Sequence, residues 1–103
     1  MWVRQWSARA TPEGAESYRA HFQRDVRPRL ETIPGHRGAL LLRRDDGSRV
    51  TLVVLTFWES MDAIRSFAGT DVTTAVVAPE ARAFLEDYDR DVVLFDVLAE
   101  TRA

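Results

Sequence analysis

The sequence predicts an α+β protein of the ferredoxin-like class, with the element order β-α-β-β-α-β and a single domain over residues 1–103. Three observations lead to this prediction. A β-type run is followed by an amphipathic helix pattern, two long apolar runs are separated by a hairpin signal, and a broken helical region leads into a last apolar run. In this order the strands form an antiparallel sheet, and the helices cover one of its faces.

The first third of the chain predicts one strand and one long helix. Trp2 to Arg9 alternates loosely and is rich in aromatic and β-preferring residues, which indicates a strand. Thr11 is placed to cap the helix, with Pro12 at its first position, and Pro34 and Gly35 stop it. Its apolar stripe consists of residues three or four apart: Ala15, Tyr18, Phe22, Val26, Leu30 and Ile33.

The middle of the chain predicts a β-hairpin and a short helix. Asp46-Gly47 separates two β-type runs, at 36–44 and 48–58, and is the strongest short-range hairpin signal in the chain. Ser60 is a natural N-cap, and Gly69 closes the helix that it begins. The apolar positions of that helix are Met61, Ile64, Phe67 and Ala68.

The remainder of the chain predicts helical pieces and a last strand. Asp71 is placed to cap a short helical piece through Val77, and Pro79 to open a further turn or two. The acidic stretch 86–91 is most simply a solvated turn, and 91–100 reads as the last strand.

The predicted strands are apolar on both faces, which bears on assembly. The runs at 39–42, 50–58 and 92–95 do not alternate cleanly between apolar and polar residues, as a sheet with one solvated face would. An apolar outer face of several strands normally marks an interface. We therefore expect a homodimer in which two sheets pack face to face, giving a dimeric α/β barrel; the alternative is a monomer that tolerates the patch.

Composition excludes several classes of protein and site. The chain has no cysteine, which excludes disulfides and cysteine-ligated metals and agrees with a cytoplasmic location. The net charge is −2 and the arginines are scattered among acids, so nucleic acid is not expected as a partner. Arg4 interrupts the stretch where a signal peptide would be apolar, and no run is long enough to span a membrane, so no membrane association is expected.

Three residues are candidates for chemistry. Trp58 ends the third strand on the same side as Val54, so its indole is either a core plug or the wall of a cavity, with the core reading favoured. His21 is the natural acid or base near neutral pH, but it lies on the flank of the helix stripe, where solvent exposure is the simpler reading. Tyr18 lies nearer the stripe, where its phenol is either core or a donor into a cavity.

Other motifs are absent or weak. His36 lies beside glycines in a turn, and the two histidines lack the carboxylate spacing of a metal site, so no metal is expected. No serine elbow, glycine-rich phosphate loop or dinucleotide fingerprint occurs. RNA-recognition domains share the element order, but the third strand here is aliphatic where theirs carries stacking rings.

Over residues 3–97 the chain resembles the antibiotic biosynthesis monooxygenase (ABM) domain family. The stretches that carry the resemblance are HFQRDVRPRLETIPGHRGALLLRRDDG, from residue 21, and LVVLTFWESMDAIRSFAG, from residue 52. The resemblance implies a subunit that dimerises through its sheet and holds a cavity between sheet and helices. Members of the family oxygenate polycyclic aromatic substrates without metal or flavin, or degrade haem. Trp58 matches a tryptophan that the oxygenating members place at this strand end.

The chain also departs from these relatives. Val54 stands where the quinone-forming members have an asparagine, and Ile64 where they have a tyrosine. The asparagine of the haem degraders falls near Gln5 or Trp6, their tryptophan at Phe67 and their ligating histidine at or beside Val77. Haem degradation is therefore not expected.

Two hypotheses follow from the sequence. The first is a cofactor-independent monooxygenase for a small aromatic, polyketide-like substrate, with His21, Tyr18 and Trp58 as candidate catalytic residues. The second is a non-catalytic dimeric module that binds a small apolar or aromatic ligand. In either case the expected lining of the cavity is Phe22, Val54, Trp58, Ile64 and Phe67.

Overall fold

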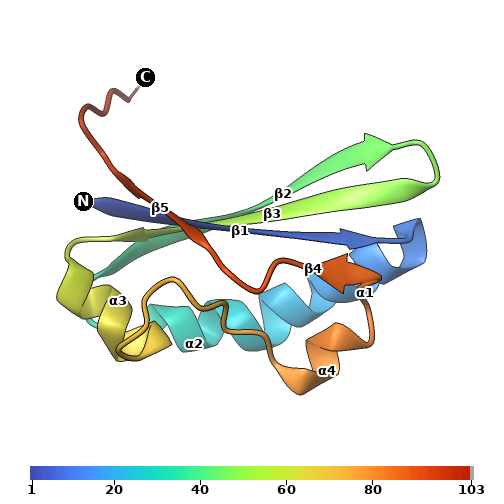
Figure 1. Cartoon of the computed structure of the whole chain (residues 1–103), viewed down its shortest axis with the longest axis horizontal. Coiled ribbons are helices and arrows are strands. Elements are labelled where there is room, and N and C mark those ends of the chain that lie inside the picture. The colour runs from blue at the N-terminus through green and yellow to red at the C-terminus, as the bar shows by residue number, and fades with distance from the viewer. Residues whose placement is uncertain (103) are drawn as a thin grey trace.

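The computed structural model describes residues 1–102 as an antiparallel sheet with helices on one face (Figure 1). Two long strands form the hairpin and a third lies beside it. The helices and the irregular segment after α3 lie together under the sheet, while its other face carries no element (Figure 1). The predicted α+β, ferredoxin-like class is confirmed. The strands are β1 (Trp2–Ala10), β2 (His36–Asp46), β3 (Arg49–Trp58), β4 (Asp87–Tyr88) and β5 (Val93–Asp96).

The sheet has the order β2-β3-β1-β4, and β5 also pairs with β1. In the ferredoxin-like order the last strand borders β1, and here that position is shared by two short strands. β4 pairs with the end of β1, at Ala8 and Arg9, and β5 pairs with its beginning, from Trp2 to Gln5. The last strand expected over 91–100 therefore forms only as β5, from Val93 to Asp96, and β4 lies before the predicted range. Between the two pieces Val92 turns inward, where it is 6% exposed, and its N–H donates to the Thr73 carbonyl at 2.7 Å.

One long helical stretch crosses the sheet in three segments. These are α1 (Pro12–His21), the π-helical turn η1 (Phe22–Val26) and α2 (Arg27–Glu31). The predicted start is confirmed, because the Thr11 side chain accepts a hydrogen bond from the Gly14 N–H at 3.0 Å and Pro12 is the first helical residue. The π-helical turn explains why apolar residues recur every four positions from Tyr18 to Leu30 without drifting off the face.

The short helices are α3 (Met61–Ala68) and α4 (Pro79–Arg82). The Ser60 side chain caps α3 by accepting from the Ala63 N–H at 3.1 Å, and Gly69 ends it at a positive φ of 87°, both as predicted. The helical piece predicted from Asp71 to Val77 does not form. Its β-branched residues disfavour a helix, and the Asp71 carboxylate instead closes a turn by accepting from Thr73 and Thr74.

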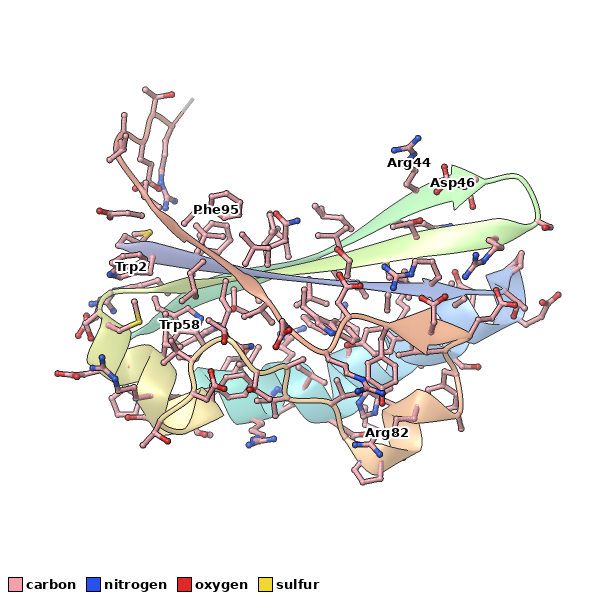
Figure 2. All side chains as sticks on the ribbon, viewed as in Figure 1. Trp2, Arg44, Asp46, Trp58, Arg82 and Phe95 are labelled. Carbon is pink, nitrogen blue, oxygen red and sulfur yellow. The ribbon has the colours of Figure 1, made fainter. Side chains whose placement is uncertain are left out.

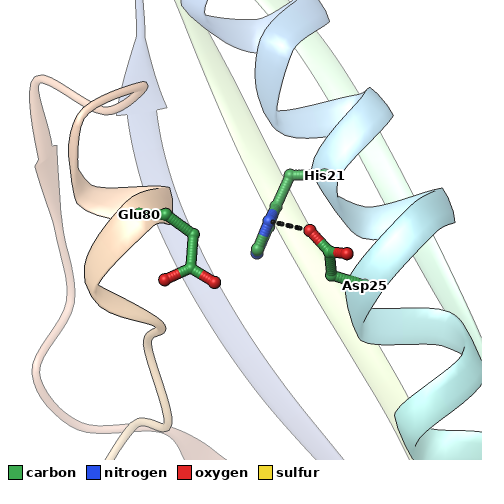
Figure 3. A group of neighbouring side chains, drawn as sticks. All are labelled: His21, Asp25 and Glu80. Atoms are coloured by element: carbon green, nitrogen blue, oxygen red, sulfur yellow. Dashed lines mark hydrogen bonds and ion pairs between the residues drawn. The ribbon is translucent and has the colours of Figure 1, made fainter.

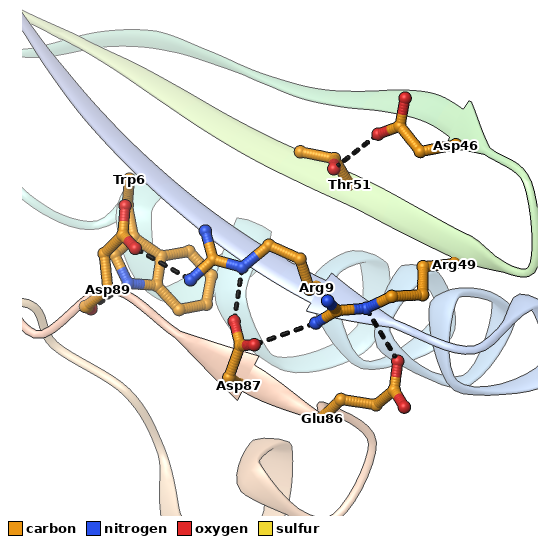
Figure 4. Close-up of polar contacts among 8 residues, drawn as sticks. All are labelled: Trp6, Arg9, Asp46, Arg49, Thr51, Glu86, Asp87 and Asp89. Atoms are coloured by element: carbon orange, nitrogen blue, oxygen red, sulfur yellow. Dashed lines mark hydrogen bonds and ion pairs between the residues drawn. The ribbon is translucent and has the colours of Figure 1, made fainter.

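The predicted solvated turn at 86–91 is also wrong. Asp87 and Tyr88 form β4, and the acids pair with arginines of the sheet (Figure 4). Arg9 contacts Asp87 and Asp89, and Arg49 lies 2.8 Å from Asp87 and 3.3 Å from Glu86. These ion pairs hold the short edge strand against β1.

The outer face of the sheet is apolar, as the sequence predicted. Phe95 points away from the helices, whereas Trp58 lies between sheet and helices (Figure 2). The strand registers place Phe57 opposite Val3, and Val3 opposite Phe95, on this outer face. The exposed large side chains here, 42–51% accessible, are Leu40, Leu42, Val93 and Phe95. The homodimer that this face suggests remains a prediction.

No helix in residues 1–102 has both the length and the apolar character needed to cross a bilayer.

Candidate functional site

A cavity of about 210 Å³ lies between the inner face of the sheet, the long helical stretch and the segment that follows α3. Ligand sites typically span about 300–1,000 Å³, so this cavity fits a small aromatic molecule better than a large one. The sheet contributes its floor through Arg4, Trp6, Val54 and Thr56, and the helical stretch one wall through Tyr18, His21, Asp25, Val26, Arg29 and Leu30. The opposite wall consists of Phe67, Val76, Val77, Ala78, Glu80 and Ala81.

His21 is the buried titratable base of this cavity, with only 2% of its surface exposed. Its Nδ1 lies 3.1 Å from Asp25 Oδ2. His21 ends α1 and Asp25 lies in the π-helical turn that follows, so the turn sets their relative position. A carboxylate only accepts hydrogen bonds, so in a neutral imidazole Nδ1 carries the proton and Nε2 has the free lone pair.

Asp25 is held as a carboxylate. The guanidinium of Arg24 lies 3.2 Å from it and is the main reason that the pKa of Asp25 is lower than its ordinary value; His21 adds to the effect. A charged Asp25 orients the imidazole and stabilises the imidazolium that forms when Nε2 takes a proton.

Glu80 faces the same pair from α4 (Figure 3). One donor atom from each of His21, Asp25 and Glu80 lies within 4.8 Å of the others. Imidazole and carboxylate are ligand types for divalent transition metals, so these three residues are the ones that would hold a cation at this site.

Tyr18 supplies a neutral donor beside the base. Its ring centroid is 5.7 Å from that of His21 and 5.9 Å from that of Trp6. Burial raises the pKa of the Tyr18 phenol to about 12, so the hydroxyl stays protonated at physiological pH. It can donate a hydrogen bond to an oxygen atom of a ligand.

The structure brings only some of the sequence-predicted residues to the cavity. Tyr18, His21, Val54 and Phe67 line it, and His21 is buried rather than solvated. His21 lies on the flank of the apolar helix stripe, as predicted, but the C-terminal part of the chain covers that flank. The Phe84 ring lies 6.2 Å from the imidazole, and Ala81 and Glu80 line the adjacent wall.

Trp58, Phe22 and Ile64 do not line this cavity. Trp58 has no exposed surface, its Nε1–H donates to Thr56 Oγ1 at 2.8 Å, and its ring stacks on Phe67 with centroids 5.5 Å apart. Ile64 belongs to the same solid cluster, and Phe22 packs in the core toward the β2–β3 hairpin, beside Leu41 and Leu52. Trp58 therefore supports a cavity residue instead of touching a ligand.

His36 also differs from the expected surface turn. It begins β2, its ring meets Trp58 edge-on at 5.2 Å, and its Nε2 is buried without a hydrogen-bond partner in residues 1–102. This burial lowers the pKa of His36.

Sequence reasoning missed several polar or aromatic residues of the cavity, including Arg4, Trp6, Asp25 and Glu80. Three of these four carried a usable signal. Arg4 and Trp6 share strand parity with the small buried residues Ala8 and Ala10, and Asp25 follows His21 by four residues on a helix. Glu80 comes from a segment whose path over the helix no local pattern predicts.

Comparisons with known proteins give a consistent result. The profile of the antibiotic biosynthesis monooxygenase family matches residues 1–86. No curated protein sequence matches the chain. A Bacillus cereus protein that bears the same family name superposes with a TM-score of 0.70 at 14% identity, over 99% of this chain and 97% of that one.

Two structures with bound molecules are also similar. The monooxygenase ActVA-Orf6 of Streptomyces coelicolor, solved with nanaomycin D, gives a TM-score of 0.67 at 18% identity, over 99% of this chain and 91% of that one. The haem-degrading protein MhuD of Mycobacterium tuberculosis, solved with two haems in its active site, gives 0.62 at 23% identity, over 97% and 99%. At these identities the likeness shows a shared fold.

Proposed function

The chain belongs to the antibiotic biosynthesis monooxygenase family, and from that premise we propose that it is a cofactor-independent monooxygenase. Its substrate would be a small, oxidisable aromatic molecule of the polyketide type, bound in the cavity between sheet and helices. The observation that carries the proposal is the buried His21–Asp25 pair on the cavity wall, with a protonated phenol beside it. A buried, oriented base is what substrate deprotonation requires.

The proposed reaction begins with proton transfer. His21 Nε2 takes a proton from a phenolic hydroxyl or from the activated ring carbon of the substrate, and Asp25 stabilises the imidazolium. The substrate anion then passes one electron to O₂, and the resulting radical and superoxide combine to form a C–O bond. The peroxide anion so formed takes the proton back from the His21 imidazolium, and the resulting hydroperoxide loses water and leaves a new carbonyl group. One oxygen atom enters the product and the other leaves as water, so the substrate itself is the reductant.

The remaining lining supports this chemistry. Trp6, Val54 and Phe67 provide apolar surface for a planar ring, and such surface also admits O₂. The Tyr18 hydroxyl would donate to the oxygen that gains negative charge, either on the substrate or on the developing peroxide. Trp58 has a supporting role in this proposal, because it stacks on Phe67 without reaching the cavity.

Assembly is part of the proposal. Two copies would pack through their outer sheet faces, covering the exposed side chains of Leu40, Leu42, Val93 and Phe95. Solvent rarely contacts so many large apolar side chains on neighbouring strands of a monomer. The expected result is a dimeric mass by light scattering at micromolar concentration, and a monomeric mass would contradict it.

The second candidate is a non-catalytic module that binds a small aromatic ligand in the same cavity. Val54 favours it, because the cavity floor has an aliphatic residue where the quinone-forming relatives are expected to have a polar one. Haem is not the substrate we propose. Val77 lines the cavity where the resemblance places the iron ligand of haem degraders, and an aliphatic side chain cannot ligate iron.

Oxygen uptake with anthrone- and hydroquinone-like substrates tests the enzyme proposal. The wild type should consume oxygen, and His21→Gln should lower the rate by about 100-fold or more, the usual contribution of a general base. Asp62→Asn is a matched control, because this exposed acid on α3 contacts only surface groups.

A chelator arm accompanies this experiment, because His21, Asp25 and Glu80 are also metal-ligand types. The proposal expects the rate to be unchanged by the chelator and by added divalent ions. A rate that depends on a divalent ion would overturn cofactor independence. No turnover across a broad panel would leave the binding module as the function.

A further inference from the structure

Arg4 is a buried cation on the floor of the cavity. It lies on β1 between sheet and helices, and only 5% of its surface is exposed. The arginines that form salt bridges in this chain are exposed or half-exposed, and within residues 1–102 Arg4 has no carboxylate within 4.0 Å. Buried charges are normally paired, so an unpaired one at a cavity requires an explanation.

Two backbone carbonyls fix the guanidinium in place. Arg4 Nε donates to the Val72 carbonyl at 3.2 Å, and Nη2 donates to the Thr74 carbonyl. These contacts satisfy part of the donor set only. In the described part of the chain Nη1 has no acceptor, so its N–H groups and the second one on Nη2 remain available to a ligand.

Burial of Arg4 carries an energetic cost for the charged guanidinium. Desolvation lowers the pKa of the Arg4 guanidinium to about 10, and no acid offsets the effect. The group is still a cation at neutral pH. A bound anion would restore the pairing that the protein itself does not supply.

A second arginine adds positive charge at the same end of the cavity. Arg29 also lines the cavity, and its Cζ lies 5.3 Å from the centroid of the Phe67 ring, against 5.6 Å for Arg4 Cζ. The acids on the cavity wall do not neutralise this end. Asp25 pairs with Arg24 and His21, and neither Asp25 nor Glu80 lies within ion-pair distance of Arg4 or Arg29.

We infer that the cavity binds an aromatic ligand that carries a carboxylate, with the carboxylate on the free N–H groups of Arg4 and the ring against Phe67 and Trp6. This inference rests on the proposed function only in using the same cavity, and it narrows the substrate class to aromatic acids. Guanidinium and carboxylate match in geometry, and such hydrogen bonds are stronger than those between neutral groups.

Calorimetric titration with two inert probes tests the inference on the wild-type protein. 2-Naphthoate and 2-naphthamide have the same ring and nearly the same size, and differ in charge. Neither has a hydroxyl that the proposed reaction could oxidise, so binding is measured without turnover. We expect the carboxylate to bind at least about tenfold more tightly than the amide, from one charge-assisted contact in a buried site.

Three variants identify the residue responsible for the preference for the carboxylate over the amide. Arg4→Gln should bring the two affinities to within about twofold by loss of that contact, and Arg29→Gln should reduce the preference only in part. Arg44→Gln is the control, since Arg44 is on the hairpin and its side chain is 81% exposed. If Arg4→Gln does not fold, the affinities of the wild type and of Arg29→Gln for the two probes still test the inference.

Several results would overturn the inference. Equal binding of the two probes by the wild type would show that Arg4 only ties the 72–74 segment to β1. The same conclusion follows if a folded Arg4→Gln protein keeps the preference, or if neither probe binds at millimolar concentration. The two proposals can fail separately. If 2-naphthoate binds through Arg4 but oxidisable aromatic acids cause no oxygen uptake, the enzyme proposal is contradicted and this inference stands.

Discussion

Two tryptophans lie under the same sheet and have different surroundings. Trp58 ends β3 in a solid cluster with Leu30, Ala63 and Ile64, and none of its surface is exposed. Trp6, on the neighbouring strand, lines the cavity, and its ring is 5.9 Å from that of Tyr18. Both indoles donate a hydrogen bond, to Thr56 Oγ1 at 2.8 Å and to the Asp89 carbonyl at 2.7 Å respectively.

The difference shows that depth of burial does not identify a site. Trp58 is the more buried of the two, and its indole N–H is satisfied by Thr56, although the Nε2 of the neighbouring His36 is buried without a partner in residues 1–102. Around Trp6, three polar side chains line a cavity, namely Arg4, His21 and Tyr18, and in residues 1–102 Arg4 Nη1 and His21 Nε2 have no hydrogen-bond partner. Several polar groups that converge on a cavity with an apolar wall indicate a ligand site, whereas a filled cluster indicates stability.

The largest expected effect is on stability, at the Trp58 end. Trp58→Ala should lower the free energy of unfolding by about 3–5 kcal/mol, because it removes the largest side chain of a filled core and leaves a cavity. Urea denaturation measures the change. Trp2→Ala is the control, since Trp2 lies at the same end of the sheet but is only half-buried, and its loss should cost clearly less. A loss below 1 kcal/mol for Trp58→Ala would contradict the distinction, since core truncations cost more than about 2 kcal/mol.

A smaller effect, on activity alone, is expected at the Trp6 end. Asp25→Asn should lower kcat by about 10- to 100-fold, because a neutral amide stabilises the imidazolium less well and no longer fixes the proton on Nδ1. Stability should change little, since the Asp25 side chain is 41% exposed. Glu31→Gln, an exposed acid of α2 paired with Arg27, should retain full activity. Equal rates for Asp25→Asn and the wild type would remove Asp25 as a positioning residue for His21.

A pH experiment examines the burial of Tyr18. Its pKa is raised to about 12 in the folded protein from 10.0 in the free side chain, so the stability that Tyr18 contributes is fully present below pH 10 and is lost as the pH rises toward 12. At pH 11 the loss is about 1.4 kcal/mol relative to neutral pH. Tyr18→Phe should lack this loss, so its stability relative to the wild type should rise by that amount between pH 9 and pH 11. A constant difference across that interval would mean that the phenol is solvated.

Much of the fold follows from local sequence signals. Thr11 and Ser60 cap helices because their side chains reach free N–H groups three residues on. The hairpin turns at Gly47-Ser48, one residue after the predicted Asp46-Gly47, because glycine readily adopts the positive φ of 71° found at Gly47. Parity along β3 correctly placed Val54 and Trp58 on the helix side.

The site was harder to predict because it depends on contacts distant in sequence. Whether His21 is buried is decided by residues about 60 positions later, which pack over the helix flank. Two carbonyls of the segment after Gly69 accept hydrogen bonds from Arg4, at the other end of the chain. Neither contact can be predicted from the hydrophobic periodicity or the residue spacing of the local sequence. The resemblance directed attention to Trp58, whereas the geometry directs it to Trp6, Arg4 and His21.

A crystal structure with bound 2-naphthoate tests the central claim most directly. The account predicts that the ring lies between Trp6 and Phe67 within reach of Tyr18 and His21, with its carboxylate on Arg4 and with the Trp58 cluster unchanged. A ligand seated on the outer sheet face, or one that displaces Trp58 while the Trp6 cavity stays empty, would contradict it.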